Sequence, residues 1–151
     1  SSSSNVGNKE KEDVKIKKKV AIIGAGAAGL AAARIFSKNA SSPNIDIDLV
    51  VLEKNDSGGG VWNYVKNSKS TPVYRGLKTN LPKEIMAYRE KPWGGDGIGN
   101  SFVTHTQVLS YLDEYATDYK LHPYISYGCQ VTQLSIQNVD NNTNNNNNNN
   151  N

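Results

Sequence analysis

The sequence predicts an α/β fold built on a parallel sheet, and three observations support this fold class. Val20-Ala21-Ile22-Ile23 is a short apolar run of the kind that forms a strand buried on both faces. This run leads directly into the turn Gly24-Ala25-Gly26-Ala27-Ala28-Gly29, and the alanine-rich segment that follows without proline is typical of a helix. A second apolar run, Ile45–Leu52, ends on an acid, Glu53. These features form a strand–turn–helix–strand unit.

The glycines of the turn have the G-x-G-x-x-G spacing of a Rossmann-like dinucleotide-binding unit. Gly24 permits a tight exit from the strand, Gly26 leaves no side chain between backbone and diphosphate, and Gly29 lets the helix lie close to the sheet. The free N–H groups and positive dipole end of the helix then face the diphosphate. The alternative is an ordinary β-α-β unit whose glycines serve only packing.

Glu53 stands where the acid that binds a ribose is expected, at the end of the second strand. Its carboxylate accepts hydrogen bonds from a 2′- and 3′-hydroxyl pair and repels a 2′-phosphate. NADP is therefore a poor candidate for this cradle, whereas FAD and NAD both remain. Ser57-Gly58-Gly59-Gly60-Val61-Trp62 follows. It is either a loop with a packing tryptophan or a backbone segment that approaches a ligand, with Trp62 covering it.

The other elements are predicted from local patterns. We expect the central strand of the sheet at Lys18–Gly24, the crossover helix at Gly26–Asn39, a short helix in Leu81–Tyr88 with Pro82 in its first turn, a helix capped by Thr104 or Thr106 that runs to about Lys120, and one or two short strands in Tyr124–Ile136. The apolar stripe of the last helix is Val108, Leu109, Leu112, Tyr115, Ala116 and Tyr119.

Composition divides the 151 residues into three parts. We expect a disordered polar and basic arm over 1–18, a folded dinucleotide-binding domain over 19–137 and a low-complexity asparagine tail over 138–151. The net charge is +3, but much of the lysine excess lies in the arm without interleaved aromatic residues, which argues against nucleic-acid binding. No apolar stretch is long enough for a signal peptide or a membrane span, so we expect a cytoplasmic chain without a membrane segment.

Structural rather than catalytic roles are expected for several polar or reactive residues. The single cysteine, Cys129, excludes a disulfide framework and a thiolate metal site within the chain, and we expect it to be a small buried apolar residue. His105 is expected at the surface or as a helix cap, and His122 in an exposed turn before a proline. Trp93 is expected to pack rather than to bind substrate. We predict no metal site.

A larger set of motifs resembles the N-terminal part of flavin-containing monooxygenases, most closely the plant and fungal members. Glu53 is followed by Gly59-Gly60-Val61-Trp62 and then by Thr79-Asn80-Leu81-Pro82-Lys83-Glu84. The resemblance continues through Pro92-Trp93 to about Ile136. These motifs in this order are far more specific than the glycine turn alone, and a plain NAD-dependent dehydrogenase has no reason to carry the last two.

The resemblance implies positions for FAD. The diphosphate falls on Gly24, Ala25, Gly26, Ala27, Ala28 and Gly29, the adenosine ribose on Glu53, and the ribityl chain and flavin ring near Val61, Trp62, Asn80 and Leu81. Thr79 and Asn80 also match family positions that touch the nicotinamide nucleotide. Asn80 is the candidate catalytic residue, as an amide that hydrogen-bonds the flavin hydroperoxide or the nicotinamide. From the residues alone, the favoured interpretation of Asn80 is an asparagine that stabilises a turn before Leu81-Pro82.

The resemblance also implies a reaction. In such enzymes NADPH reduces FAD, O₂ adds to the flavin C4a atom as a hydroperoxide, and the distal oxygen passes to a soft nitrogen or sulfur nucleophile such as an amine or thioether. FAD and NADPH are thus the expected cofactors, and a small nucleophilic molecule and O₂ the expected partners. Because the cofactor supplies the chemistry, a site of this kind needs no conspicuous acid–base pair.

The chain departs from the family in one respect, since a second glycine fingerprint for NADPH and the family's Phe-x-Gly and His-bearing sequence are both missing. We therefore expect an N-terminal fragment or truncated product that ends before the NADPH domain and is inactive in isolation. Residues 19–137 are then a partial, N-terminal FAD-binding domain. Attachment to the endoplasmic reticulum would come through a missing C-terminal part. The alternatives are a Baeyer–Villiger or N-hydroxylating flavoprotein, or a non-catalytic remnant that binds FAD or nothing.

Overall fold

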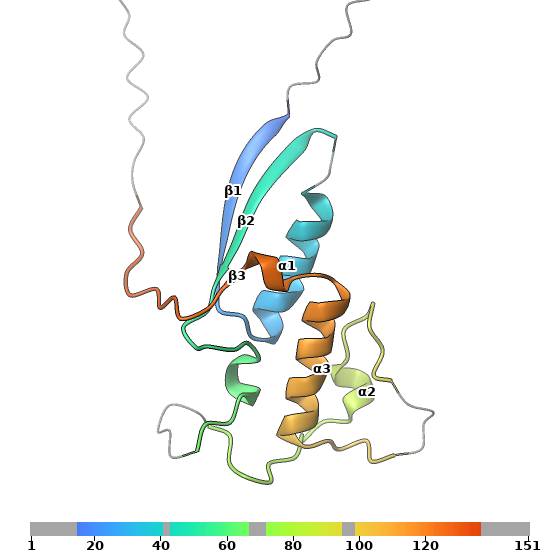
Figure 1. Cartoon of the computed structure of the whole chain (residues 1–151). Helices are drawn as coiled ribbons and strands as arrows, with labels where there is room; N and C mark the ends of the chain where they lie inside the picture. The colour runs from blue at the N-terminus through green and yellow to red at the C-terminus, as the bar shows by residue number, and fades with distance from the viewer. Residues whose placement is uncertain (1–14, 41–42, 67–71, 95–98, 137–151) are drawn as a thin grey trace, which may run out of the picture.

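The described part of the protein is a parallel sheet with helices on one side, as the computed structural model shows (Figure 1). Residues 15–40, 43–66, 72–94 and 99–136 are described. The three strands have the order β1-β2-β3, and both pairings are parallel. The expected α/β class with a parallel sheet is therefore confirmed. Most of the predicted basic arm and the predicted asparagine tail lie outside the described residues.

The first unit follows the sequence closely. β1 spans Ile16–Ile23, α1 spans Ala27–Asn39 and β2 spans Ile45–Leu52. β1 begins two residues before the expected strand, so Ile16 and Lys17 belong to the sheet rather than to the arm. Each residue of β1 pairs with one of β2 in continuous register, from Ile16 opposite Ile45 to Ile23 opposite Leu52. The carboxyl ends of the two strands therefore meet at one edge, where the glycine turn and Glu53 follow.

The prediction that β1 is the central strand, buried on both faces, is wrong for the described residues. β2 lies in the middle, and β1 forms an edge with Ile16 and Ile23 more than half exposed. A strand is central only when another strand pairs on its far side, and no described segment does so for β1. An apolar run is typical of a strand that is buried on both faces, but it does not indicate which segment pairs with that strand on its second edge.

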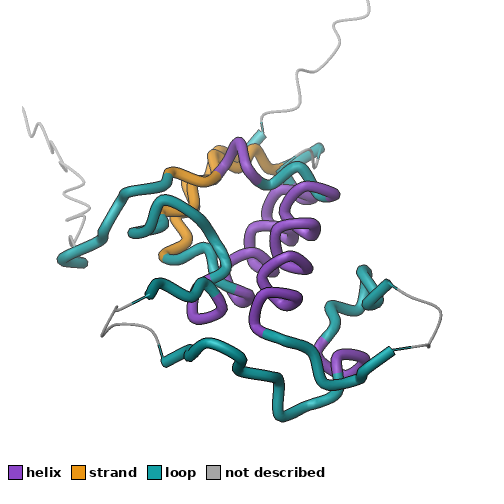
Figure 2. Tube along the Cα trace, turned by 60° about the horizontal axis from the view of Figure 1, so that its bottom comes forward, coloured by secondary structure: helices purple, strands orange, loops and turns teal. Residues whose placement is uncertain are grey.

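The two faces of the sheet differ. α1 and α3 (His105–Asp118) lie on the same side of it (Figures 1 and 2), and Leu49 and Val51 of β2 are buried toward them. Side chains alternate along a strand, so Ala21 and Ile23 of β1 belong to the opposite face, where both are exposed. The apolar core of the described residues is thus built between one sheet face and the two helices.

α3 lies below α1 in the view of Figure 1. It begins at a capping box. The Thr104 side chain accepts a hydrogen bond from the Gln107 amide, and the Gln107 side chain accepts one from the Thr104 amide. Thr104, rather than Thr106, is therefore the cap. The helix ends at Asp118, two residues before the expected end. Its buried face includes Tyr111 in addition to most of the predicted stripe, whereas Leu109 is only half-buried.

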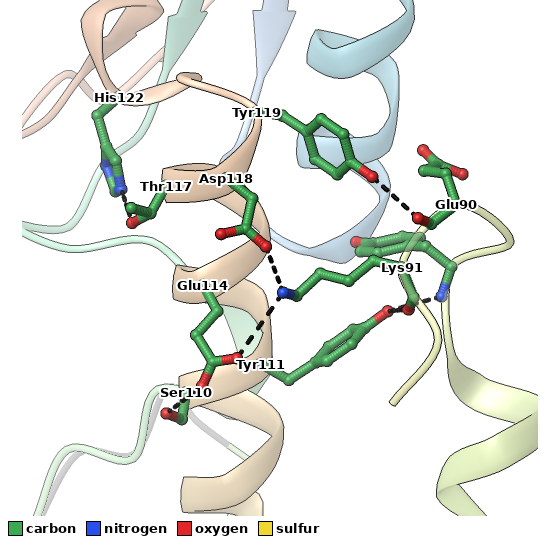
Figure 3. A network of polar contacts seen from close by, with 10 residues as sticks. Glu90, Lys91, Ser110, Tyr111, Glu114, Thr117, Asp118, Tyr119 and His122 are labelled. Atoms are coloured by element: carbon green, nitrogen blue, oxygen red, sulfur yellow. Dashed lines mark hydrogen bonds and ion pairs between the residues drawn. The ribbon is translucent and has the colours of Figure 1, made fainter. Parts of the chain in front are cut away.

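The segment before α3 crosses over that helix and is tied to it by aromatic and polar contacts (Figure 3). It holds the short helix α2 (Lys83–Met86), so a helix is present within Leu81–Tyr88 as expected, but Pro82 is its N-cap rather than a residue of its first turn. Trp93 stacks on Tyr111 with ring centroids 4.2 Å apart, which confirms its packing role. The Tyr111 hydroxyl donates to the Lys91 carbonyl oxygen at 2.7 Å, and the Lys91 ammonium lies between two carboxylates of α3.

The last segment forms less strand than its alternation suggested. Only Ile125–Ser126 is a strand, β3, and it follows a short 3₁₀ turn at His122–Tyr124. Gly128 has a φ of +67°, and the amides of Gly128 and Cys129 donate to the Asn55 and Glu53 carbonyl oxygens just past β2. Beyond it, Leu134 and Ile136 are more than four-fifths exposed, so these apolar side chains have no described surface to pack against. Alternation alone does not make a strand where no neighbouring strand is present to pair with it.

Candidate cofactor site

The glycine turn after β1 has the geometry that its sequence predicts. Gly24 adopts a φ of +94°, and its amide donates to the Leu52 carbonyl oxygen at 2.8 Å, which fastens the turn to β2. Gly26 is the N-cap of α1. A Cβ atom on Gly29 would lie 1.9 Å from the Gly24 carbonyl oxygen, so any side chain there would collide with backbone. The helix approaches the turn this closely only because position 29 is a glycine.

The second glycine cluster folds back onto the first. The Gly59 amide donates to the Ala25 carbonyl oxygen at 2.9 Å, and a Cβ atom on Gly60 would lie 3.0 Å from the Gly26 Cα atom. Gly59 and Gly60 both have positive φ angles, of +99° and +55°. Two backbone segments more than thirty residues apart in sequence therefore lie against each other with no side chain between them. A flexible loop would not need this close contact between two backbones.

Glu53 joins these segments at the end of β2. Its side chain is only 3% exposed, and Oε2 accepts a hydrogen bond of 2.7 Å from the Ala25 amide. The Oε1 atom accepts two further bonds, both of 2.9 Å, from the backbone and side-chain nitrogens of Asn55. The backbone of Glu53 is bonded as well, since Cys129 donates to its carbonyl oxygen at 2.8 Å. The carboxylate is thus held at the mouth of the glycine turn.

A cavity of about 360 Å³ opens at this place. Of the residues predicted from sequence to bind a cofactor, Gly24, Gly26, Glu53 and Val61 line it. Ala25 is fully buried beneath the turn, while Ala27, Ala28 and Gly29 form the first turn of α1 behind it. A cavity that has glycine backbone on one side and a carboxylate beside it fits the diphosphate and ribose of a dinucleotide.

The cavity also has a wall that sequence reasoning missed. It is formed by Pro72 and by the segment Cys129-Gln130-Val131, with Asn55 beside Glu53. Cys129 is exposed, so the expectation that it is a small buried residue is wrong. The position of Cys129 just after a strand could have indicated this wall, because ligands of open parallel sheets bind outside the carboxyl ends of the strands. Because β3 is only two residues long, the sequence did not indicate where that strand ends.

Thr79, Asn80 and Leu81 are not among the residues that line the cavity. Thr79 is 5% exposed and serves a local ladder: its amide donates to the Val103 carbonyl oxygen at 2.8 Å, and its hydroxyl oxygen accepts from the Val103 amide at 3.2 Å. Asn80 and Leu81 are exposed directly after this anchored residue. The structure therefore brings Glu53 and the glycine clusters together, and presents Asn80 separately on a fixed backbone.

The remaining candidate residues occupy structural positions. Trp62 is partly buried against the core at the end of the turn Gly60–Trp62. His105 is 7% exposed, so the surface expectation is wrong, and Thr104 rather than His105 caps the helix. The His105 amide donates to the Leu77 carbonyl oxygen, and its ring lies edge-on to Tyr64, which buries it. His122 is partly exposed near a turn, with a ring nitrogen 3.2 Å from the Thr117 hydroxyl.

Two negative findings apply to the described ranges only. Within them, no group of three or more His, Cys, Asp or Glu side chains is arranged to hold a metal ion. None of the helices in this part of the chain combines the length and the apolar character needed to cross a membrane.

Comparison with known proteins identifies the family. The chain is 33% identical over 137 residues to the flavin-containing monooxygenase FMO GS-OX4 of Arabidopsis thaliana, covering 79% of this chain and 28% of that protein. It is 32% identical over 120 residues to dimethylaniline monooxygenase [N-oxide-forming] 4 of Homo sapiens, covering 78% of this chain and 20% of that protein. The chain thus spans less than a third of the length of these relatives.

Solved structures agree. The S-allyl-L-cysteine S-oxygenase of Allium sativum superposes with a TM-score of 0.66 and 27% identity, over 81% of this chain and 30% of that one. The description of the matching family is flavin-binding monooxygenase-like, and the match extends over residues 17–147. A match over most of the sequence, joined to the glycine turn and the carboxylate described above, establishes the relationship. The chain belongs to the flavin-binding monooxygenase-like family.

Proposed function

We propose that this chain binds FAD and forms the FAD-binding part of an NADPH-dependent monooxygenase that oxygenates soft nitrogen or sulfur nucleophiles. The observation that carries the proposal is the position of Glu53, whose buried carboxylate meets the Ala25 amide beside the cavity between the two glycine clusters. A carboxylate oxygen accepts two hydrogen bonds, and Oε2 accepts one from a described donor. It therefore retains capacity for a ribose hydroxyl.

The diphosphate would be bound by backbone rather than by side chains. Gly24, Ala25, Gly26, Ala27, Ala28 and Gly29 form the turn and the first turn of α1, where the N–H groups of a helix have no intrahelical partner. The absence of a Cβ atom at Gly26 and Gly60 lets the two backbones pack against each other beside the start of α1. An anion placed there gains hydrogen bonds and the favourable end of the helix dipole.

The flavin end of the cofactor is assigned to the second glycine cluster and to the segment after it. Val61 and Trp62 follow Gly60 directly, and Val61 is more than half exposed at the cavity. Thr79 and Asn80 are assigned to the nicotinamide nucleotide, and Asn80 and Leu81 to the flavin ring. The ladder between Thr79 and Val103 supports the catalytic assignment of Asn80, because a residue with direct contact to the reacting atoms needs a fixed backbone.

Bound FAD, once reduced by NADPH, supplies the activated oxygen for the transfer, while the protein binds, orients and shields the reacting groups. The relatives favour the substrate class. One is named for S-oxygenation of S-allyl-L-cysteine and another for N-oxide formation on dimethylaniline, so sulfur and nitrogen nucleophiles both occur among similar proteins. The alternatives are a Baeyer–Villiger or N-hydroxylating flavoprotein, and a non-catalytic FAD-binding remnant.

Competition among nucleotides tests the proposal. We expect FAD to bind the full chain, NAD to compete weakly and NADP to compete least, because Glu53 repels a 2′-phosphate. Glu53→Gln should relax the discrimination against NADP while Asp56→Asn, an exposed acid on the adjoining loop, should not. Oxidation of NADPH in the presence of a thioether or tertiary amine separates the enzyme from the remnant. Equal binding of NADP and FAD by the unsubstituted chain would contradict the cofactor assignment.

A further inference from the structure

The side chain of Tyr88 reaches the first turn of α1 from a distant part of the sequence. Its hydroxyl donates a hydrogen bond of 2.5 Å to the carbonyl oxygen of Ala27, 61 residues earlier. Its amide donates to the Tyr111 hydroxyl at 2.8 Å, and that hydroxyl in turn donates to the Lys91 carbonyl oxygen. Tyr88 lies in the loop between α2 and α3. These bonds therefore connect that loop to α1 through Ala27 and to α3 through Tyr111.

The acceptor of this bond is the important detail. The Ala27 carbonyl belongs to the same peptide group as the N–H of Ala28, which is the second residue of α1. The first N–H groups of a helix have no intrahelical partner. In α1 the Leu30 amide forms the bond to the N-cap, since it donates to the Gly26 carbonyl oxygen. A donor on the Ala27 oxygen polarises the peptide and makes the Ala28 N–H a stronger donor to an anion.

We propose that Tyr88 is a positioning residue for the diphosphate-binding turn, acting through its hydroxyl on the Ala27–Ala28 peptide. This inference rests on the proposed binding of FAD. Tyr88 lies eight residues after Asn80, so the same segment that carries the candidate catalytic amide also fixes the start of α1. The family motifs leave Tyr88 without a role. Its ring alone would fill the aromatic cluster equally well as phenylalanine.

Tyr119 provides a matched comparison within the same cluster. Its hydroxyl also donates to a backbone carbonyl oxygen, that of Glu90, at 3.0 Å (Figure 3). Its ring packs on Tyr115 with centroids 4.7 Å apart, as the Tyr88 ring does at 4.1 Å. The two tyrosines therefore share ring packing and hydrogen-bond type. They differ in that only Tyr88 reaches the glycine turn.

The test compares Tyr88→Phe with Tyr119→Phe in the full chain, since each removes one hydroxyl and leaves the ring. FAD affinity is measured by quenching of flavin fluorescence, and backbone amide exchange by NMR over residues 25–30. Tyr88→Phe should raise the dissociation constant for FAD about three- to tenfold and accelerate exchange of the Leu30 amide, which donates to the Gly26 carbonyl oxygen at the start of α1. Tyr119→Phe should change neither, with melting temperatures of the two variants alike.

Each outcome decides the inference. Unchanged affinity and exchange in Tyr88→Phe, or equal changes in both variants, would overturn it. If the unsubstituted chain takes up no FAD, the proposed function fails on its own. The exchange measurement then still decides whether Tyr88 fixes the first turn of α1.

Discussion

The carboxylate of Glu53 accepts a hydrogen bond of 2.7 Å from the amide of Ala25, 28 residues earlier in the chain. This contact joins the end of β2 to the turn that follows β1, and it lies under the cavity between the two glycine clusters. It serves both the fold and the proposed cofactor site. The first prediction separates these two roles.

Glu53→Gln should retain more of the stability than Glu53→Ala and lose most of the affinity for FAD. A glutamine oxygen still accepts from the buried Ala25 amide, while the glutamine NH₂ group faces the two Asn55 nitrogens and cannot accept from them. Glu53→Ala leaves the Ala25 amide unpaired as well, at a cost of about 1–3 kcal/mol. We therefore expect the alanine variant to unfold at clearly lower urea concentration than the glutamine variant. Flavin fluorescence and urea titration measure the two properties. Equal stability of both variants would contradict the role given to the Ala25 contact.

Gly29→Ala should destabilise the chain because its Cβ atom would lie 1.9 Å from the Gly24 carbonyl oxygen. The helix must move away from the turn, and overpacking of this kind costs about 1–3 kcal/mol. Gly94→Ala is the control, since a Cβ atom at that position meets nothing within 4 Å. Urea unfolding measures both variants. A Gly29→Ala chain as stable as Gly94→Ala would show that the helix does not pack as described.

The cap of α3 gives a prediction that also tests the choice between two threonines. Thr104→Ala removes the side-chain acceptor for the Gln107 amide and should cost about 1 kcal/mol. Thr106→Ala, two residues further along at an exposed position, should cost much less. Thermal unfolding followed by circular dichroism compares the two. A larger loss of stability in Thr106→Ala than in Thr104→Ala would contradict the assignment of Thr104 as the N-cap of α3.

The Tyr115–Glu90 contact should make stability depend on acid. The Tyr115 hydroxyl donates to Glu90 at 2.6 Å, and this bond holds the pKa of the Glu90 carboxyl below its usual value. A lowered folded-state pKa means that the stabilisation is complete above the unfolded pKa and is lost as pH falls through the folded one. The melting-temperature difference between the unsubstituted chain and Tyr115→Phe should therefore shrink from about pH 7 to about pH 3.

Tyr119→Phe is the control for that series, because Tyr119 donates to the backbone oxygen of Glu90, which does not titrate. Its effect on the melting temperature should not change over the same range. A Tyr115→Phe difference that is constant with pH would contradict the contact with the ionised carboxylate. Burial raises the pKa of Tyr115 itself, so the hydroxyl stays protonated throughout.

The sequence predicted the elements whose signals are local. The glycine turn, β2 and the N-terminal cap of α3 follow from residue type and spacing within a few positions, and the structure has them where expected. Their physical causes, such as a steric requirement for glycine or a side-chain acceptor at a helix start, act over one turn of chain.

Features that depend on distant partners were harder to predict. The place of β1 in the sheet depends on which segments pair with it, and among the described residues only β2 does. The burial of His105 depends on Tyr64 and on the segment at Leu77. The wall at Cys129 was missed because β3 is only two residues long. The backbone contact between Gly26 and Gly60 has no local signal at all, since each cluster alone is compatible with a free loop.

The uptake of FAD by the full chain tests the central claim most directly. The protein is mixed with FAD, freed of unbound flavin by gel filtration, and its visible absorbance is compared with that of Glu53→Ala. We expect the unsubstituted chain to retain flavin and the variant to retain much less. A chain that remains folded and elutes without flavin, at FAD concentrations up to solubility, would contradict the claim that Glu53 and the two glycine clusters form an FAD site.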